Sequence, residues 1–222
     1  MRGRCSGDGR TAGDALMARD RASRPEARPL RLFVAVDVPE AVRDLVAVAV
    51  APWRDRHPRA KWVPKQNQHV TVKFLGSTWP RLVELVTQAL AGVAGASAPF
   101  DTRVTGLGAF PTPRRARVLW AGLDDTGGRM AAVAAALDEA LAKEFEPEKR
   151  AFTAHLTVAR FDPPVPLGDD LSATEFRTDA FPIDRLVLYR SHLQRPAPVY
   201  EPLAEFPLGG GAEVVDPEHT FE

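Results

Sequence analysis

Cysteine is nearly absent from this sequence, with Cys5 the single one among 222 residues. One cysteine excludes a disulfide scaffold and a zinc site built from cysteines, and it fits a reducing compartment. Long hydrophobic runs are also missing, since no segment approaches the roughly 18 apolar residues that a membrane helix needs. The apolar run at 45–53 is too short and starts too late to be the core of a signal peptide. The sequence therefore predicts a soluble, cytoplasmic protein without a membrane partner.

An excess of charge of one sign is missing as well. Lys and Arg total 29, and Asp and Glu also total 29. Net charge therefore gives no global field that would steer the chain toward nucleic acid or a membrane surface. A nucleic-acid substrate would have to be held by a local basic patch. Apolar residues make up 45% of the chain, which is enough to bury a core.

Large apolar residues are rare at both ends of the chain. A segment rich in Gly, Ser, Arg and Asp cannot bury enough surface to offset the entropy lost on ordering. The sequence predicts a disordered basic extension at 1–28, a single domain at 29–208 and a disordered acidic tail at 209–222. For the extension, composition favours an unstructured segment, with a truer start at Met17 as one version of it, over an arm that attracts RNA.

Apolar patterning between these ends alternates between strand and helix. Strands are predicted at 31–36, 69–76, 100–110, 117–123 and 152–161, followed by a terminal hairpin at 183–193 and 200–208. Helices are predicted from Pro39, from Pro80 and after Gly128, where apolar residues recur at helical spacing. Each half of the chain then contains strands and a helix, which indicates an α+β fold of two lobes related by pseudo-symmetry.

A His-x-Thr motif occurs twice, in HVTVKF at 69–74 and in HLTVAR at 155–160. Residues two apart on a strand face the same side, so each His projects together with its Thr. If the lobes face each other, the site gains two imidazoles and two hydroxyls. Imidazoles titrate near neutral pH and can act as general base and general acid, while hydroxyls can donate hydrogen bonds to phosphate oxygens. The pattern indicates phosphodiester transfer.

Other readings of the two motifs are less favoured. A lone His on a strand is more often structural than catalytic, but the repetition of the motif reverses that preference. A metal site would need more His, Cys or carboxylate ligands at set spacing. The G-x-S-x-G elbow of serine hydrolases and a Gly-rich P-loop are both missing from the sequence.

Five segments in order resemble the 2H phosphoesterase superfamily, and within it the RNA 2′,3′-cyclic phosphodiesterases, also called 2′–5′ RNA ligases. They are RLFVAVDVPE, WVPKQNQHVTVKFLG, RVLWAGL, FTAHLTVAR and VLYRSHLQRPAPVYEPL. The resemblance implies a bilobal α+β fold, a pseudo-twofold pair of antiparallel sheets flanked by helices, with the active-site cleft between the sheets. It implies hydrolysis of an RNA-terminal 2′,3′-cyclic phosphate to a 2′-phosphomonoester without a metal or other cofactor. It also implies a weak, reversible 2′–5′ joining of tRNA half-molecules.

The same resemblance assigns roles to five motif residues. His69 and His155 correspond to the catalytic pair, and Thr71 and Thr157 to hydroxyls that bind the phosphate. Arg160 corresponds to an arginine that meets the phosphate at the end of the second motif. Because Arg160 lies five residues beyond His155, it reaches the same side only if the strand ends or bulges near Ala159.

Further side chains are weighed as substrate contacts. Lys73 has the parity to face the cleft, with a solvated strand-end lysine as the alternative. Phe33 and Trp120 could stack on a base, although aromatic residues in apolar strands are more often core. The basic run at 114–117 could meet an RNA backbone, with a solvated turn as the favoured alternative.

The function expected is attack of water on the cyclic phosphorus, with His155 assigned as base and His69 as acid, although the near-equivalence of the lobes leaves this order open. The expected partners are RNA ends that bear a 2′,3′-cyclic phosphate, tRNA fragments included, and the expected state is a monomer. Two alternatives stay open. One is a catalytically silent module that binds RNA ends, and the other is a 2H enzyme that acts on a small cyclic nucleotide or another phosphodiester.

Overall fold

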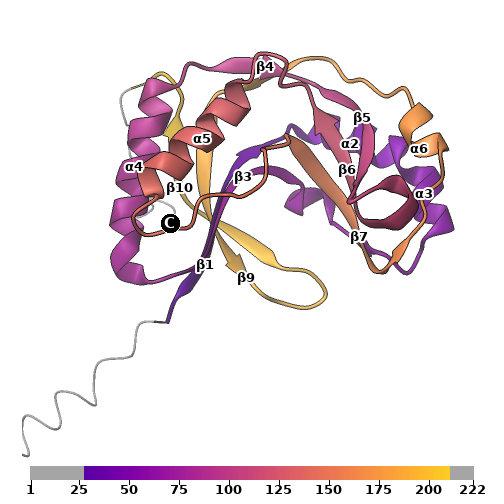
Figure 1. Ribbon diagram of the computed structural model, residues 1–222, viewed down its shortest axis with the longest axis horizontal. Helices are drawn as coiled ribbons and strands as arrows, with labels where there is room; N and C mark the ends of the chain where they lie inside the picture. Colours follow the sequence, from indigo (N-terminus) through magenta and orange to yellow (C-terminus); the bar gives the residue numbers. More distant parts are fainter. Residues whose placement is uncertain (1–27, 211–222) are drawn as a thin grey trace, which may run out of the picture.

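The computed structural model describes residues 28–210, and its chain path is drawn in Figure 1. The predicted extension at 1–28 and tail at 209–222 lie outside the described residues, except at the points where they join the domain. Their predicted disorder stays a prediction. Within 28–210, no helix is both long enough and apolar enough to cross a membrane.

Eight strands of the described residues form one antiparallel sheet (Figure 1). Seven of them follow in the order β10 (Val199–Pro207), β9 (Arg185–His192), β1 (Leu30–Asp37), β3 (His69–Thr78), β7 (His155–Val165), β6 (Ala116–Leu123) and β5 (Val104–Phe110). The eighth, β2 (Lys61–Trp62), pairs with β7. A separate two-stranded sheet joins β4 (Phe100–Thr102) to β8 (Phe181–Ile183).

The two halves of the large sheet meet at a single residue pair. Strands β3 and β7 share only the pairing of Val70 with Leu156, whereas β1 with β3 and β6 with β7 pair over most of their lengths. The α+β class is confirmed. The expected pair of separate sheets is corrected to one sheet with a narrow joint, because the two motif strands hydrogen-bond to each other near their first residues.

Two groups of helices cover the sheet, and each group contains helices from both halves of the sequence. Helices α4 (Val83–Ala96) and α5 (Arg129–Leu141) pack on each other, and α5 contacts β3 while α4 contacts β9 and β10 (Figure 1). Helices α2 (Glu40–Ala49), α3 (Ala51–Arg56) and α6 (Asp170–Ala173) lie toward β5, β6 and β7. Short 3-10 turns are η1 (Lys65–Asn67), η2 (Pro80–Leu82) and η3 (Pro113–Arg115). Each half of the sheet is thus covered by helices from both halves of the chain.

Most predicted elements are confirmed. The differences are one strand that is divided in two and four short elements that were not predicted, namely α3, α6, β2 and β8. The segment predicted as one strand at 100–110 is divided at Arg103, whose carbonyl accepts a hydrogen bond from the backbone N–H of Asp124 at 2.9 Å. There the chain passes from the small sheet to the large one. Helix α3 was not predicted. It begins after α2 ends because Pro52 has no N–H to donate to the preceding turn and is tolerated only at the start of a helix.

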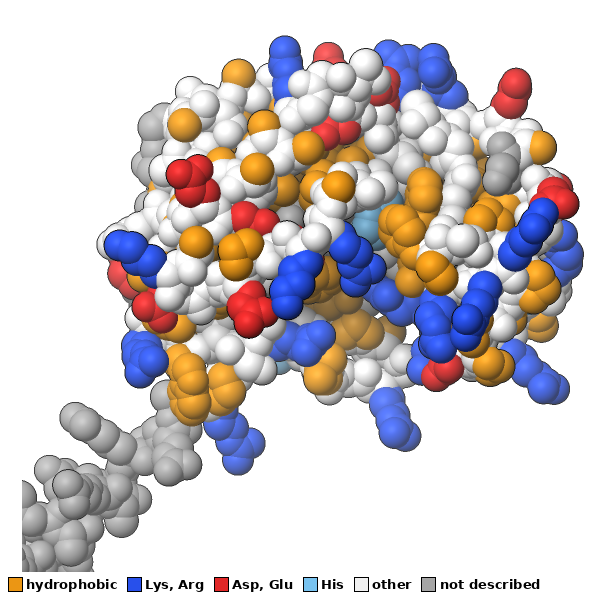
Figure 2. Space-filling model, in the orientation of Figure 1, with side chains coloured by type: hydrophobic (Ala, Val, Ile, Leu, Met, Phe, Trp, Pro, Cys, Tyr) orange, Lys and Arg blue, Asp and Glu red, His pale blue; other side chains and the backbone are white. Residues whose placement is uncertain are grey.

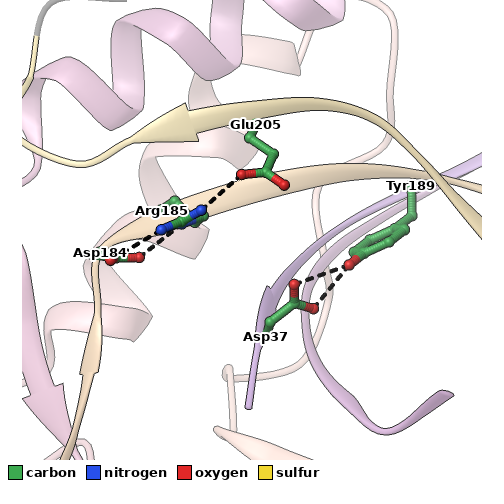
Figure 3. Close-up of polar contacts among 5 residues, drawn as sticks. All are labelled: Asp37, Asp184, Arg185, Tyr189 and Glu205. Carbon is green, nitrogen blue, oxygen red and sulfur yellow. Dashed lines mark hydrogen bonds and ion pairs between the residues drawn. The ribbon is translucent and has the colours of Figure 1, made fainter. Parts of the chain in front are cut away.

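The predicted terminal hairpin is present as β9 and β10, and an arginine joins its strands at the open end. Arg185 contacts the carboxylates of Asp184 and Glu205, each at 2.9 Å (Figure 3). All three side chains are about half exposed, so this contact contributes little to stability. Buried apolar residues, Leu186, Leu188 and Phe206 among them, hold the hairpin in the core.

Both motif strands contain a β-bulge at the same position. Consecutive residues of β1 oppose Thr71 and Lys73, so Val72 is the extra residue in β3. Val158 is the extra residue of β7 in the same way, against β6. An extra residue reverses the side that each later residue of the strand faces. The two strands accordingly share one pattern of burial over their first seven residues, with two consecutive buried positions at and after the bulge.

The bulge turns Lys73 into the interior of the protein. Its side chain is 1% exposed, and its ammonium group pairs with the carboxylate of Asp138 on α5. The ammonium also donates to the backbone carbonyl of Glu146 at 3.4 Å. The expectation that Lys73 faces the cleft is therefore wrong, because the parity argument assumed a regular strand. Lys73 ties β3 to α5.

Replacing Asp138 by Ala should leave the Lys73 ammonium buried without its carboxylate. We expect the free energy of unfolding to fall by about 3 to 5 kcal/mol, the usual range when one partner of a buried pair is removed. The double variant Lys73→Met/Asp138→Leu, which makes the contact apolar, should recover most of that loss. Urea denaturation of the three proteins measures both effects. A single variant as stable as the parent protein would show that the pair contributes nothing.

Candidate active site

The joint between β3 and β7 brings the two His-x-Thr motifs together. In an antiparallel pair, the residues that flank a paired position lie across from each other. On either side of Val70 and Leu156, each His of one strand therefore lies across from the Thr of the other. The facing residues are His69 with Thr157, and His155 with Thr71. All four are partly buried, whereas Val70 and Leu156 are completely buried on the opposite side.

A cleft of about 450 Å³ opens on the side of the joint that bears these residues. Of the seven residues predicted for the site, five line it, namely Phe33, His69, Thr71, Thr157 and Arg160. His155 lies beside the lined volume, near enough for its charge to act on His69. Lys73 does not line the cleft. The space-filling view shows a histidine in a hollow of this face, with Lys and Arg side chains gathered next to it (Figure 2).

The ring of His69 is held by aromatic side chains on two sides. It stacks on Phe33 with ring centroids 4.8 Å apart, and the edge of Tyr200 meets it at 5.2 Å. Its Nε2 lies 3.1 Å from the hydroxyl oxygen of Thr71. Phe33 is only 3% exposed, so its ring supports the histidine and has little free face for a substrate base.

Tyr189 extends this aromatic group and is anchored by a carboxylate. Its ring stacks on Phe33 at 5.3 Å, and its hydroxyl donates to the two carboxylate oxygens of Asp37 at 2.9 and 3.1 Å (Figure 3). Burial, and then the charge of Asp37, raise the pKa of Tyr189, so it stays a neutral donor. Sequence reasoning missed both Tyr189 and Tyr200. The available signal was that the chain's two tyrosines both lie in the predicted terminal hairpin.

The ring of His155 is oriented by a backbone carbonyl and two aromatic edges. Its Nδ1 lies 2.8 Å from the carbonyl oxygen of Thr153, which can only accept, so Nδ1 carries a proton and Nε2 of the neutral ring holds the lone pair. Phe110 meets the ring edge-on at 5.2 Å, and Trp120 lies at 6.3 Å. Trp120 thus supports a histidine from the side, which explains its position better than stacking on a base.

The environment of both histidines favours the neutral ring in the free protein. Burial is the largest cause for each, and together with the smaller effects of neighbouring groups it lowers the pKa of His69 to about 4. Arg160 and His155 act in the same direction as burial, while a backbone hydrogen bond with Asn67 opposes them. Burial also lowers the pKa of His155, a backbone contact with Thr153 opposes the shift, and Arg160 adds to it. A negative charge in the cleft would act on both rings in the opposite direction.

The bulge that Arg160 requires is present at Val158, one residue before Ala159. It places Arg160 on the same side of β7 as His155 and Thr157. Arg160 is exposed and lines the cleft. The equivalent position in β3 is Phe74, which also lines the cleft and is 57% exposed. The pseudo-symmetry of the two motif strands therefore breaks at this position, with a cation on the β7 side and an aromatic ring on the β3 side.

The arginines of the basic run named from the sequence lie outside the cleft lining, as do the other two described histidines, His57 and His192. Arg114, Arg115 and Arg117 are at η3 and the start of β6, and Arg117 is 3.9 Å from the carboxylate of Asp162. His57 packs edge-on against Phe161, and His192 pairs with Glu201. Among residues 28–210, no three His, Cys, Asp or Glu side chains gather as a metal site would require.

Comparison with known proteins agrees with this geometry. The sequence profile described as the 2′-5′ RNA ligase superfamily matches residues 41–195. The chain belongs to the 2′-5′ RNA ligase superfamily. An RNA 2′,3′-cyclic phosphodiesterase of Thermus thermophilus is 33% identical to this superfamily member over 193 residues, which cover 82% of this chain and 91% of that protein. One of Geobacillus stearothermophilus is 27% identical over 183 residues, which cover 82% of this chain but only 58% of that longer protein.

Solved structures of similar proteins share the fold of this 2′-5′ RNA ligase superfamily member. A crystal structure of a Thermus thermophilus protein aligns with a TM-score of 0.66 and 28% identity, covering 82% of this chain and 100% of that one. The crystal structure of Escherichia coli LigT complexed with 3′-AMP aligns with a TM-score of 0.62 and 24% identity, covering 82% of this chain and 99% of that one.

Gly108 is the position where a small change should disturb the His155 side of the site. A Cβ on Gly108 would overlap the indole ring of Trp120, which itself packs beside His155. We expect Gly108→Ala to lower the free energy of unfolding by about 1 to 3 kcal/mol, the range for overpacking. Thermal unfolding monitored by circular dichroism measures the change.

A matched Gly→Ala control is available at Gly92 in α4, where an added Cβ meets nothing within 4 Å. In a helix interior this substitution should stabilise by about 1 kcal/mol. Equal effects of the two substitutions would contradict a steric role for Gly108.

Proposed function

We propose that this chain hydrolyses RNA-terminal 2′,3′-cyclic phosphate to a 2′-phosphomonoester by acid/base catalysis with two histidines. The observation that carries the proposal is the convergence of two His-x-Thr motifs at the joint of β3 and β7, beside one cleft. Membership of the 2′-5′ RNA ligase superfamily supports the same reaction, as do relatives named RNA 2′,3′-cyclic phosphodiesterase. In this proposal the two halves of the sheet act as pseudo-twofold lobes, and the cleft between them is the active site.

In the proposed reaction, a water oxygen forms a bond to phosphorus while the bond from phosphorus to the 3′ oxygen breaks. His155 removes the water proton through Nε2, which the Thr153 contact leaves with its lone pair. His69 donates a proton to the departing 3′ oxygen. The hydroxyls of Thr71 and Thr157 and the guanidinium of Arg160 stabilise the negative charge on the non-bridging oxygens. The 2′ oxygen keeps the phosphate.

The substrate itself supplies the charge that makes His69 an acid. Burial and Arg160 disfavour a second positive charge in the cleft of the free protein. A bound phosphate brings a negative charge beside the ring, and the interaction is strong because little water screens it there. The pKa of His69 then rises, and the ring takes up a proton. The different contacts of the two histidines support this order, which the nearly equivalent motifs leave open.

Replacing either histidine should abolish most of the activity. With a short RNA ending in a 2′,3′-cyclic phosphate, and with EDTA present, we expect His69→Ala and His155→Ala each to lower the rate by at least ~10²-fold, the usual scale for losing an acid or a base. His57→Ala, which removes a histidine outside the cleft, is the matched control. Product analysis should give a 2′-phosphate from the parent protein. Near-normal activity in either cleft variant would remove that histidine from the reaction.

Arg160 should set the position of the pH profile. Its charge lowers the pKa of both histidines, so Arg160→Met should raise both pKa values and move the bell-shaped profile of kcat/KM to higher pH. Arg160→Lys keeps the charge and should keep the profile in place while weakening phosphate binding, because a lysine lacks the planar fork of donors. Rates measured across the acid and neutral range compare the three proteins. A profile that stays in place for Arg160→Met would contradict the electrostatic role.

The same site could join RNA ends if a 5′-hydroxyl took the place of water, which would give a 2′–5′ bond, with tRNA halves as candidate substrates. The two alternatives to hydrolysis of RNA ends make different predictions for one assay. Tight binding of the RNA without turnover would favour a silent binding module. Turnover confined to small cyclic nucleotides would favour a 2H enzyme that acts on such nucleotides. We further propose a monomer whose working unit is the domain at 29–208.

A further inference from the structure

A second cation stands directly beside Arg160 at the mouth of the cleft. In the pairing of β2 with β7, Lys61 opposes Arg160. Directly opposed residues of an antiparallel pair project to the same face with their Cβ atoms ~5 Å apart. Both side chains are exposed. Lys61 therefore lies on the cleft side of the sheet, next to a residue that lines the cleft.

The position of Lys61 is fixed by its neighbours in the short strand β2. The backbone N–H of Val63 donates to the carbonyl of Val158 at 2.8 Å. The indole N–H of Trp62 donates to the carbonyl of His57 at 3.1 Å, and the guanidinium of Arg54 covers the same indole at 4.9 Å. These contacts hold β2 against β7 after the bulge, so Lys61 faces Arg160 in the free protein.

In the part of the chain that the structure describes, no carboxylate compensates this pair of like charges. Like charges directly opposite each other destabilise a sheet. Among residues 28–210, no carboxylate pairs with Lys61 or with Arg160. The acidic residue that follows Arg160 on the same face, Asp162, is itself paired with Arg117. Two uncompensated cations side by side form a site for an anion larger than one phosphate.

The chemistry of a ribose explains where a second phosphate would lie. The cyclic phosphate bridges C2′ and C3′, the base leaves from C1′ on one side, and the 5′ chain leaves from C4′ on the other. The cleft has one side suited to each of these two groups. The exposed ring of Phe74 lies near β3, and the cations lie near β7. If the cyclic phosphate lies at the histidines and the base against Phe74, the 5′ chain runs toward Lys61.

We propose that Lys61 binds the phosphodiester that precedes the terminal nucleotide, and that the site is built for RNA ends of two or more nucleotides. The inference rests on the proposed function. Arg160 serves the reacting phosphate and Lys61 the next phosphate along the strand, so one row of cations sets the direction in which the RNA lies. A mononucleotide lacks that phosphate and makes no contact with Lys61.

Two substrates distinguish a contact between Lys61 and the upstream phosphate from a general effect of Lys61 on activity. Adenosine 2′,3′-cyclic phosphate has no upstream phosphate, and the dinucleotide ApA 2′,3′-cyclic phosphate has one. For Lys61→Met we expect kcat/KM on the dinucleotide to fall about two- to fivefold, the scale of an exposed charge contact, with no change on the mononucleotide. The salt dependence for the dinucleotide should lose about one phosphate contact. Lys61→Arg should retain the preference, and Lys143→Met, another exposed lysine, should change neither substrate.

The unchanged rate on the mononucleotide shows in the same assay that Lys61→Met is folded. Equal losses on both substrates, or no loss on either, would overturn the inference. Equilibrium binding of the products, ApA 2′-phosphate and adenosine 2′-phosphate, provides a readout that needs no turnover. If the parent protein hydrolyses neither substrate, the proposed function fails, while weaker binding of the dinucleotide product alone by Lys61→Met still supports the Lys61 contact. Equal binding by parent and variant overturns it.

Discussion

The rest of the site depends on the pairing of Val70 with Leu156. This one contact joins the two halves of the sheet, and its antiparallel geometry places each motif histidine across from the threonine of the other strand. More extensive pairing between β3 and β7 would bring the strands together along their lengths and close the cleft. Without the pairing, no backbone ladder would fix the distance between the two motifs. A joint of one residue pair therefore provides both a fixed spacing and an open space beside it.

The two bulges decide which side chains enter that space. With regular strands, Lys73 would face the cleft and Arg160 the core, and the core would then have to bury a guanidinium. The bulges at Val72 and Val158 reverse both positions. The lysine is buried, but it reaches the carboxylate of Asp138 on α5, which satisfies its charge. The same irregularity occurs twice and supplies one cation that lines the cleft, Arg160, and one contact between sheet and helix, Lys73 with Asp138.

Local patterns were sufficient for part of this structure. The strand with its His-x-Thr motif and the helices that start at Pro39, Pro80 and Gly128 follow from spacing. The need for a bulge near Ala159 follows from strand parity only together with the role that the family resemblance assigns to Arg160. The burial of Lys73 could not be predicted, because a bulge depends on the register with another strand. Tyr189 and Asp37 lie 152 residues apart in the sequence, and only the β1–β9 pairing brings them together beside His69.

The cleft is organised around cations and neutral histidines. Burial and the charge of Arg160 favour the unprotonated form of both rings in the free protein, which limits the positive charge that the site accumulates. Arg160 nevertheless attracts an anion, and the anion reverses the electrostatic effect on the rings. The group that lowers the pKa values in the free state thus recruits the charge that raises them when the site is filled. In the proposed reaction, acid catalysis would then depend on occupancy, because burial and Arg160 oppose protonation of His69 until an anion enters the cleft.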